Sequence, residues 1–296
     1  MKRILIKTYG FIGDILFASS IAKKMHEQYG NCQVDYCIGF PQPYLLLKNN
    51  PYISNVFLSK QKGPRVLLPD NVDESVYDLI YELPECKQDI QPTIWYQQHC
   101  QITNPTPEYT IYTNSALDES TKYELDLLNR TNAKVIGYVA NWETLTAVYT
   151  EDEYKAGLNN VNQIMSHTNT NRRNISYILN ELSNCILIPL GYDHTVTQYH
   201  TSLDSTSTYT NTASIIKCCD LVIGQEGGMT NLAAGVGTKC IITTDFMHAL
   251  YGPYGVMKRF NEVKLGPANM FPSGKHINLN PFITDEEILN TIKNEL

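Results

Sequence analysis

The sequence predicts an α/β protein built from two βαβ-type halves, and two observations lead to this class. First, short runs of apolar and β-branched residues alternate along the chain with segments whose apolar residues recur every three or four positions. This alternation is typical of a parallel sheet with crossover helices. Second, the pattern occurs twice, from residue 3 and again from residue 134. At about 100–200 residues per domain, the 296 residues of the chain are enough for two such units.

The first half begins with the clearest of these patterns. Residues 3–8 form an apolar run that predicts a strand ending at Tyr9 and Gly10. We expect a helix next, because apolar residues follow at spacings of 3, 4, 3 and 4 and Gly30 then ends the pattern. That apolar face consists of Ile15, Ala18, Ala22, Met25 and Tyr29. The remaining elements expected here are a helix at 43–48, strands at 33–38, 56–58 and 78–83, and surface loops at 60–69 and 85–113.

The second half repeats the alternation. Strands are expected at 134–139, 185–190, 221–223 and 240–243, and helices at 175–182, 212–219 and 228–236. The last helix has Thr284 as its N-cap and Glu287 three residues later, which is a capping box, with Ile288 and Ile292 facing inward. A boundary between residues 127 and 131 divides the chain into predicted domains 1–130 and 131–296, with a last helix that can pack back on the first domain.

The composition excludes several classes of protein. Hydrophobic residues make up 43% of the chain and charged residues 18%, so the chain can form packed cores and is not globally disordered. The formal net charge of -7 argues against a strongly basic nucleic-acid-binding protein. No apolar run approaches the length of a membrane span or a signal peptide, and the eight cysteines form no C-x-x-C pair. We therefore expect a cytoplasmic protein with reduced thiols and no zinc-binding spacing.

The first candidate site is the turn between the first predicted strand and helix, Gly10-Phe11-Ile12-Gly13-Asp14. Open parallel sheets bind ligands at the carboxyl ends of their strands, and glycines let the backbone approach a ligand closely. A carboxylate at Asp14 could accept a proton from an acceptor hydroxyl. The structural alternative is that Asp14 only stabilises the positive end of the helix dipole. The spacing is not G-x-G-x-x-G, which argues against an NAD-linked oxidoreductase.

The second candidate site is the glycine-rich turn at residues 223–231, between a predicted strand and helix. The backbone is exposed there at Gly224, Gly227, Gly228 and Met229. The N–H groups of Gly227, Gly228 and Met229 are suited to bind a phosphate or diphosphate. Glu226 is placed to accept hydrogen bonds from sugar or ribose hydroxyls. The alternative is a tight strand-to-helix turn that needs glycine only for packing.

A third candidate is the turn YGPYG at residues 251–255, which follows Asp245 and His248. Its two aromatic residues could form the wall of a base or sugar pocket. An ordinary surface loop explains the same residues equally simply.

Cationic residues could neutralise a diphosphate or an anionic acceptor. Arg172 and Arg173 precede the helix expected at 175–182, and arginine is suited to bidentate contact with phosphate. Lys60, Lys62 and Arg65 form a small basic loop that could meet the acceptor. The alternative for both groups is solvated surface charge, which is the usual role of such residues.

The order of these segments resembles glycosyltransferase family 9, the ADP-heptose:lipopolysaccharide heptosyltransferases. The stretches that resemble the start of that family are KRILIKTYGFIGDILFASSIAKKMHEQYG, QVDYCIG and NNPYISNVF. The later stretch CCDLVIGQEGGMTNLAAGVGTKCIITT is similar to its donor-site segment, and YGPYG and ITDEEILNTIKNEL are similar to its C-terminal half. Residues 83–134 match no part of the family, and residues 142–173 are unusually long and polar.

The resemblance implies a GT-B architecture, in which two Rossmann-like domains face each other across a cleft. The N-terminal domain would bind the acceptor, and the C-terminal domain would bind a nucleoside-diphosphate sugar without a metal or other cofactor. Asp14 matches the position of the general base in the family, and Gly10 and Gly13 would contact the acceptor beside it. Glu226 and Gly227 stand where the family has Asp and Ser, so the resemblance does not identify the sugar as heptose.

Two further residues are carried over from the family with a change. Asn231 occupies the position of a histidine, and Arg172 or Arg173 would replace a lysine near the diphosphate.

Three functions remain open from the sequence. The one favoured by the resemblance is an inverting glycosyltransferase that acts on a cell-surface glycan or a lipopolysaccharide-type acceptor. A viral-type DNA glycosyltransferase acting on a hydroxylated base is an alternative, in which the loop of Lys60 would contact phosphates. A nucleotide-sugar-binding protein that has lost catalysis is the other, because residues of the donor segment differ from the family.

Overall fold

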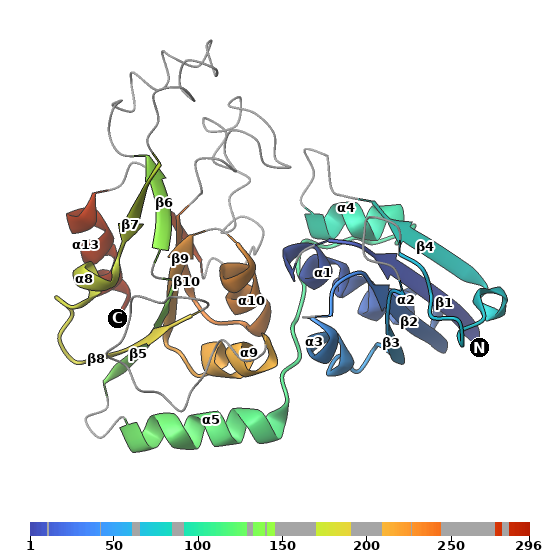
Figure 1. The fold of residues 1–296 in the computed structure, drawn as a ribbon, viewed down its shortest axis with the longest axis horizontal. Helices are drawn as coiled ribbons and strands as arrows, with labels where there is room; N and C mark the ends of the chain where they lie inside the picture. Colours follow the sequence, from blue (N-terminus) through green and yellow to red (C-terminus); the bar gives the residue numbers. More distant parts are fainter. Residues whose placement is uncertain are drawn as a thin grey trace, which may run out of the picture.

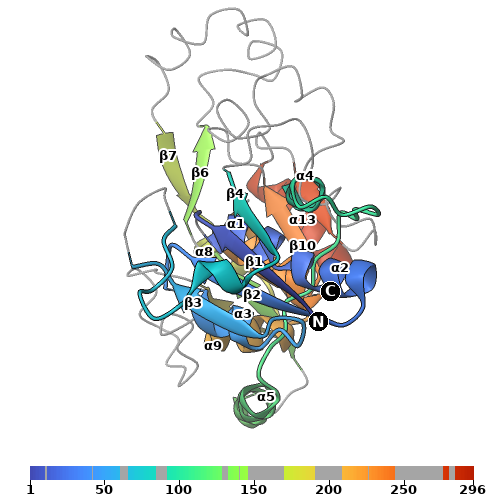
Figure 2. The ribbon, with the colours of Figure 1, turned by 90° about the vertical axis from the view of Figure 1, so that its right-hand side faces the viewer.

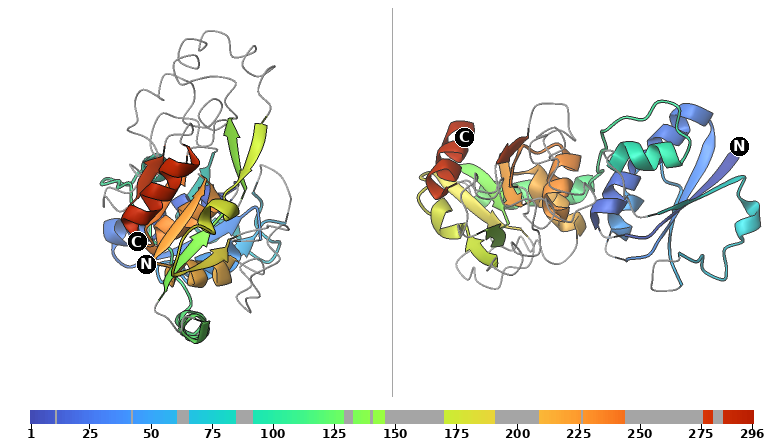
Figure 3. Two further views of the ribbon diagram at one scale, coloured as in Figure 1. Left: turned by 90° about the vertical axis from the view of Figure 1, so that its left-hand side faces the viewer. Right: turned by 90° about the horizontal axis from the view of Figure 1, so that it is seen from above.

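The computed structural model describes residues 1–10, 12–41, 43–60, 66–84, 92–128, 133–139, 141–145, 170–190, 209–225, 227–243, 276–279 and 284–296. All structural statements below concern these residues. They form two α/β lobes, which lie side by side in Figure 1 and in the right-hand view of Figure 3.

The first lobe contains a four-stranded parallel sheet in the order β3-β2-β1-β4. Its strands are β1 (Lys2–Thr8), β2 (Cys32–Ile38), β3 (Asn55–Leu58) and β4 (Leu79–Leu83). Its helices are α1 (Ile12–Ala18), α2 (Ser20–Tyr29), α3 (Tyr44–Lys48), α4 (Pro92–His99) and the short 3₁₀ helix η1 (Glu74–Val76). Successive side chains of β1 point to opposite faces of the sheet. Ile4 and Ile6 pack under the α-helices, whereas Leu5 packs against residues 66–77 on the other face.

The second lobe contains a five-stranded parallel sheet in the order β11-β10-β9-β5-β8. In Figure 2 this lobe lies behind the first. Its strands are β5 (Lys134–Tyr138), β8 (Cys185–Pro189), β9 (Leu221–Gln225), β10 (Cys240–Thr243) and β11 (Ile277–Leu279). Its helices are α5 (Ser115–Leu128), α8 (Ser176–Leu179), α9 (Tyr209–Lys217), α10 (Gly228–Val236) and α13 (Asp285–Glu295). A separate antiparallel pair is made by β6 (Asn141–Leu145) and β7 (Thr170–Asn174).

Most of the elements expected from the sequence are confirmed. All of the expected strands are present with small changes at their ends, and the helix at 228–236 has the expected bounds. The long helix after β1 is interrupted at Ser19, whose hydroxyl donates to the carbonyl of Leu16 at 2.6 Å. Such a bond from a serine to its own helix competes with the regular backbone pattern.

Two expectations about local structure are wrong. Residues 85–113 were expected to be irregular, but they contain α4, and α5 follows without having been expected. The helix expected at 175–182 is limited to the single turn Ser176–Leu179. The last helix has the predicted capping box, and its Ile288 and Ile292 are buried in the core of the second lobe. The expectation that this helix packs back on the first domain stays a prediction.

The two lobes share a continuous hydrophobic core. The cluster under α1–α4 continues through Tyr109 and Ile111 into the residues of α9 and α10. The backbone N–H of Ile111 donates to the carbonyl of Gly235 in α10 at 2.8 Å. The segment that joins α4 to α5 is therefore attached to the second lobe along α10.

The division into domains 1–130 and 131–296 stays a prediction. Helix α5 falls within the first of these ranges, but it packs against α9 of the second lobe. Asp118 of α5 accepts hydrogen bonds from Ser214 at 2.6 Å and from Lys217 at 2.7 Å. This packing favours a boundary in the segment before α5.

None of the described helices has the length and hydropathy that a membrane span requires. The seven cysteines among the described residues are free thiols.

Candidate functional site

The two glycine-containing turns predicted as candidate sites come together between the lobes. One turn follows β1 and opens α1, and the other follows β9 and opens α10. The contact is direct, because an ideal Cβ added to Gly228 would lie 2.4 Å from Cγ2 of Ile12. An ideal Cβ on Gly13 would lie 3.4 Å from Nδ2 of Asn231. The positive ends of two helices, one from each lobe, therefore meet at one place (Figure 1).

Asp14 lies half-buried in the first turn of α1, directly after the residues that contact α10. The hydroxyl of Tyr96 in α4 donates a hydrogen bond to its Oδ1 at 3.0 Å. On the other side lies Gly10, where an ideal Cβ would be 2.6 Å from Cβ and 2.7 Å from Oδ2 of Asp14. Gly10 also has φ +151°, a conformation that residues with a side chain rarely adopt. The carboxyl group is thus held between a buried phenol and a backbone that only glycine provides.

The start of α10 uses one of its N–H groups internally. The N–H of Gly227 donates to Oγ1 of the buried Thr230 at 3.1 Å. This bond occupies the N–H that Gly227 is expected to offer to a ligand, and the contact of Gly227 with the donor stays a prediction. The N–H groups of Gly228 and Met229 belong to the first turn of the helix, where no carbonyl lies one turn earlier to accept them. These two are the backbone donors that α10 can offer to an anion.

Gly224 and Asn231 have packing roles that the sequence did not reveal. Gly224 lies within β9, where an ideal Cβ would be 3.0 Å from Val139 and 3.1 Å from Thr230. Asn231 is buried in α10, and its carbonyl accepts a 2.5 Å hydrogen bond from the hydroxyl of Tyr109. Their predicted contacts with the donor stay predictions.

The predicted cations are not all placed by the structure. Lys60 forms an ion pair with Asp70, so its ammonium group already has an anionic partner. Arg172 and Arg173 lie in β7, where they pair with Glu143 and Trp142 of β6. The side chains of β7, together with Glu226, Lys62, Arg65 and residues 245–255, lie outside the described residues.

The buried ammonium group of Lys7 in the first lobe forms ion pairs within the protein. Lys7 of β1 is hydrogen-bonded to Glu74 at 2.5 Å and Glu82 at 3.1 Å. Burial lowers the pKa of the Lys7 ammonium, but the two carboxylates raise it by more, so the net shift is upward. Lys7 alternates with Ile6 along β1 and so belongs to the face opposite the helices, away from Asp14.

Sequence reasoning missed Tyr96, which contacts the predicted base directly. It lies in α4, within a segment expected to be an irregular loop. No sequence signal pairs it with a residue 82 positions away.

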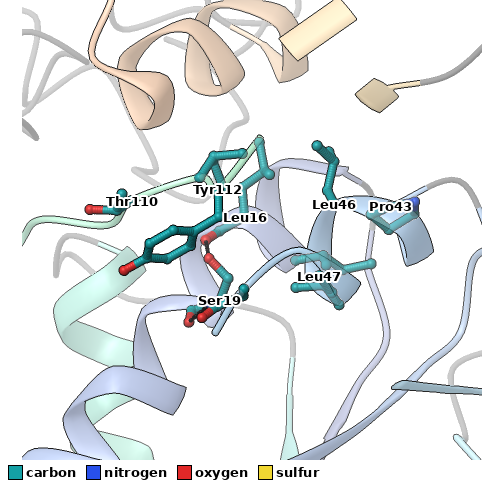
Figure 4. A pocket seen from close by; sticks show the side chains of 10 residues that line it. Leu16, Ser19, Pro43, Leu46, Leu47, Thr110 and Tyr112 are labelled. Atoms are coloured by element: carbon teal, nitrogen blue, oxygen red, sulfur yellow. Dashed lines mark hydrogen bonds between the residues drawn. The ribbon is translucent and has the colours of Figure 1, made fainter. Parts of the chain in front are cut away.

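A small pocket lies near this site but does not include it (Figure 4). It is formed by α1, α3 and the segment at 110–112, and it is mostly apolar. Its lining residues are Ile15, Leu16, Ser19, Pro43, Leu46, Leu47, Asn50, Thr110, Ile111 and Tyr112. Neither Asp14 nor the start of α10 lines it, so the pocket is separate from the candidate site. Within the described ranges, no three His, Cys, Asp or Glu residues group so as to hold a metal ion.

The protein has the GT-B glycosyltransferase fold. It consists of two α/β lobes, each with a parallel sheet, and strand-to-helix turns of the two lobes meet between them. Solved structures agree. The E. coli ADP-heptose lps heptosyltransferase II has a TM-score of 0.54 at 12% identity, with 100% of this chain and 98% of that chain covered. The glycosyl transferase family 9 protein from Veillonella parvula DSM 2008 has a TM-score of 0.51 at 11% identity, with 99% and 91% covered.

At these identities the similarity establishes the fold. No protein-family model matches the sequence, and no curated protein matches it.

Proposed function

We propose that this protein is an inverting, metal-independent glycosyltransferase that uses a nucleoside-diphosphate sugar. The observation that supports this most is the meeting of the two turns. It places the first turn of α1, which carries Asp14, against the helix end that offers the N–H groups of Gly228 and Met229. A base for the acceptor and an anion site for the donor are then adjacent, which is what a transfer between two bound substrates requires.

The proposed reaction is a single displacement. Asp14 accepts the proton of the acceptor hydroxyl while the oxygen attacks the anomeric carbon. The bond between that carbon and the diphosphate oxygen breaks, and the nucleoside diphosphate leaves with the electron pair. The N–H groups of Gly228 and Met229, the positive end of α10 and an arginine, Arg172 or Arg173, would stabilise the charge that develops on the diphosphate.

A cell-surface glycan or lipopolysaccharide-type hydroxyl is the acceptor that we propose. Two solved structures with the same fold are described as a family 9 glycosyltransferase and an ADP-heptose lps heptosyltransferase, which supports this class of substrate. A hydroxylated DNA base was the alternative acceptor. The ion pair of Lys60 with Asp70 weakens that alternative, because it occupies one of the three cations that were to contact phosphates.

The test combines binding with turnover. The protein is screened by thermal shift against ADP-, UDP-, GDP- and dTDP-sugars, and release of the nucleoside diphosphate is then measured with water and with simple glycosides as acceptors. Ligand binding to the folded state raises the apparent stability. We expect one nucleotide sugar to stabilise the protein and to be turned over.

The decisive variant is Asp14→Asn. Removal of a general base costs about 10²–10⁴-fold in rate, so turnover should fall by that factor while the thermal shift with the donor is kept. The matched control is Asp126→Asn, which makes the same change at an exposed position of α5 and should behave as wild type. Unchanged turnover in Asp14→Asn would refute the assignment of the base. Donor binding without any turnover in the wild type would identify a catalytically inactive binding protein instead.

A further inference from the structure

We propose that Tyr96 is a positioning residue that fixes the orientation and the ionised state of the Asp14 carboxylate. This inference rests on the proposed function only for the role of Asp14 as the base. The hydrogen bond itself is a property of the structure: the hydroxyl of Tyr96 donates to Oδ1 of Asp14 at 3.0 Å.

The donor of this bond is held firmly in place. The Tyr96 side chain is completely buried, and its ring packs edge-on against Trp95 with 5.1 Å between ring centroids. The next residue, Gln97, is also fully buried and ties α4 to the elements around it. Its amide nitrogen donates to Oγ of Ser20 at 2.9 Å, and its amide oxygen accepts from the N–H of Thr106 at 2.8 Å. Tyr96 therefore cannot turn away without breaking the packing of α4 on α1 and α2.

The acceptor of the bond is confined from two sides. Oδ1 of Asp14 receives the phenol hydrogen, and Oδ2 lies against Gly10. These two contacts restrict the side-chain conformation of Asp14, so the carboxylate is already oriented before the acceptor hydroxyl arrives. Pre-orientation of a reacting group lowers the entropic part of the barrier.

A hydrogen bond donated to a carboxylate also favours its charged form. The charged side chains named below, on the described elements packed against α1, have partners of their own. Helix α10 carries no titratable side chain, and Lys7 of β1 is paired with Glu74 and Glu82 on the opposite face of the sheet. On α4 the other titratable group is His99, whose Nε2 contacts the carbonyl of Glu82. The titratable side chains of α2 are Lys23, Lys24, His26, Glu27 and Tyr29. Lys23 and Lys24 both pair with Glu27, and His26 contacts the carbonyl of Tyr52.

The structure offers a closely matched pair of variants to test this. Tyr96→Phe removes the hydroxyl and keeps the ring. Tyr77→Phe removes a hydroxyl that donates to Oδ2 of Asp35 at 2.8 Å, which is also a buried tyrosine–aspartate bond but lies on the other face of the same sheet. Both variants should lose a similar amount of stability. A role of Tyr96 in folding alone would give them the same enzymatic behaviour.

The kinetic readout uses the nucleotide sugar identified by the donor screen. We expect Tyr96→Phe to lower kcat about tenfold and to leave the KM for the donor unchanged, since α10 is untouched. The acid limb of its pH–rate profile should move up by about one pH unit, which is the size expected when one hydrogen bond to a carboxylate is lost. Tyr77→Phe should keep the wild-type kcat and profile. Identical kinetics in the two variants would overturn the proposal.

A second readout does not depend on catalysis. The carboxyl carbons of aspartate are labelled with ¹³C and titrated by NMR, and the Asp14 signal is identified by its absence in Asp14→Asn. We expect its titration midpoint to rise by about one unit in Tyr96→Phe and to stay in place in Tyr77→Phe. An active wild type whose midpoint does not move in Tyr96→Phe would overturn the role of Tyr96 and leave the proposed function intact. A wild type that turns over no nucleotide sugar would overturn the proposed function, and the NMR midpoint would still decide whether Tyr96 controls the ionisation of Asp14.

Discussion

Tyr109 connects the two lobes, and its replacement should weaken both. Its ring packs edge-on against Phe17 of α1, with 5.3 Å between ring centroids. Its hydroxyl donates to the carbonyl of Asn231 in α10 at 2.5 Å. The ring also lies so close to Gly235 that an ideal Cβ there would be 2.6 Å from Cε2 of Tyr109. Burial raises the pKa of the Tyr109 hydroxyl well above its ordinary value, so it stays protonated and remains a donor at all working pH values.

The expected loss follows from these contacts. Replacing a buried aromatic ring by alanine costs about 3–5 kcal/mol, and the lost hydrogen bond adds about 1 kcal/mol. Tyr109→Ala should therefore lower the free energy of unfolding by about 4–6 kcal/mol, a large part of the 5–15 kcal/mol that is roughly typical of a folded protein. Tyr109→Phe keeps the ring and should lose only about 1 kcal/mol. Tyr123→Ala is the control, because this side chain on α5 is 65% exposed.

Urea unfolding followed by two probes measures the effect. Trp95 fluorescence in a Trp142→Phe background reports on α4 of the first lobe, and far-UV circular dichroism reports on both lobes. In the wild type the two transitions should coincide, and in Tyr109→Ala they should separate because the lobes no longer unfold together. Coincident transitions with a loss below about 1 kcal/mol in Tyr109→Ala would show that another contact couples the lobes.

Two further predictions concern Asp14 and Asp118. Gly10→Ala should reduce turnover about 100-fold, because the new Cβ would displace the Asp14 carboxylate from a position that general-base catalysis needs. The control is Gly30→Ala, which is also at a positive φ (+68°) but has nothing within 4 Å of the new Cβ, and it should keep full activity. Equal kinetics in the two variants would refute this prediction. Burial raises the pKa of Asp118, but hydrogen bonds such as that from Lys217 outweigh it and the net pKa is lowered. The stability that the ionised Asp118 contributes is therefore fully present above the unfolded pKa of about 3.9. It is lost as the pH falls through the pKa of Asp118 in the folded protein. Asp118→Asn should cost about 1–2 kcal/mol in urea unfolding at pH 7, and this cost should disappear as the pH falls below the lowered pKa of Asp118 in the folded protein. A loss that is independent of pH would contradict the ion pair.

The secondary structure could be predicted wherever burial and periodicity agree. The strands of both sheets are nearly continuous apolar runs because helices or loops cover both faces. The capping box at Thr284 was readable because it depends on residues only three positions apart. Helix α4 could not be found in this way, because buried polar residues such as Thr93 and Gln97 interrupt its apolar face. Gln97 is stabilised by hydrogen bonds to Ser20 and Thr106, which the hydrophobic pattern does not contain.

Helix α5 was missed for a different reason. Asn114 accepts hydrogen bonds at its Oδ1 from the N–H groups of Ala116 and Leu117, which is a cap at the start of the helix. This signal is present in the sequence, but no element was expected between residue 113 and the boundary at residues 127–131.

The sequence by itself determined the two α/β halves and the two glycine-containing turns, because a strand-to-helix turn has a local signature in glycine and in the first charged residue of the helix. It also singled out Asp14 as a carboxylate at such a turn. Only the tertiary structure decided that the turns meet, with Gly228 against Ile12, and that Tyr96 is bonded to Asp14. The physical reason is that these contacts join residues far apart in the chain, and their geometry depends on how whole helices pack rather than on any local pattern of residues.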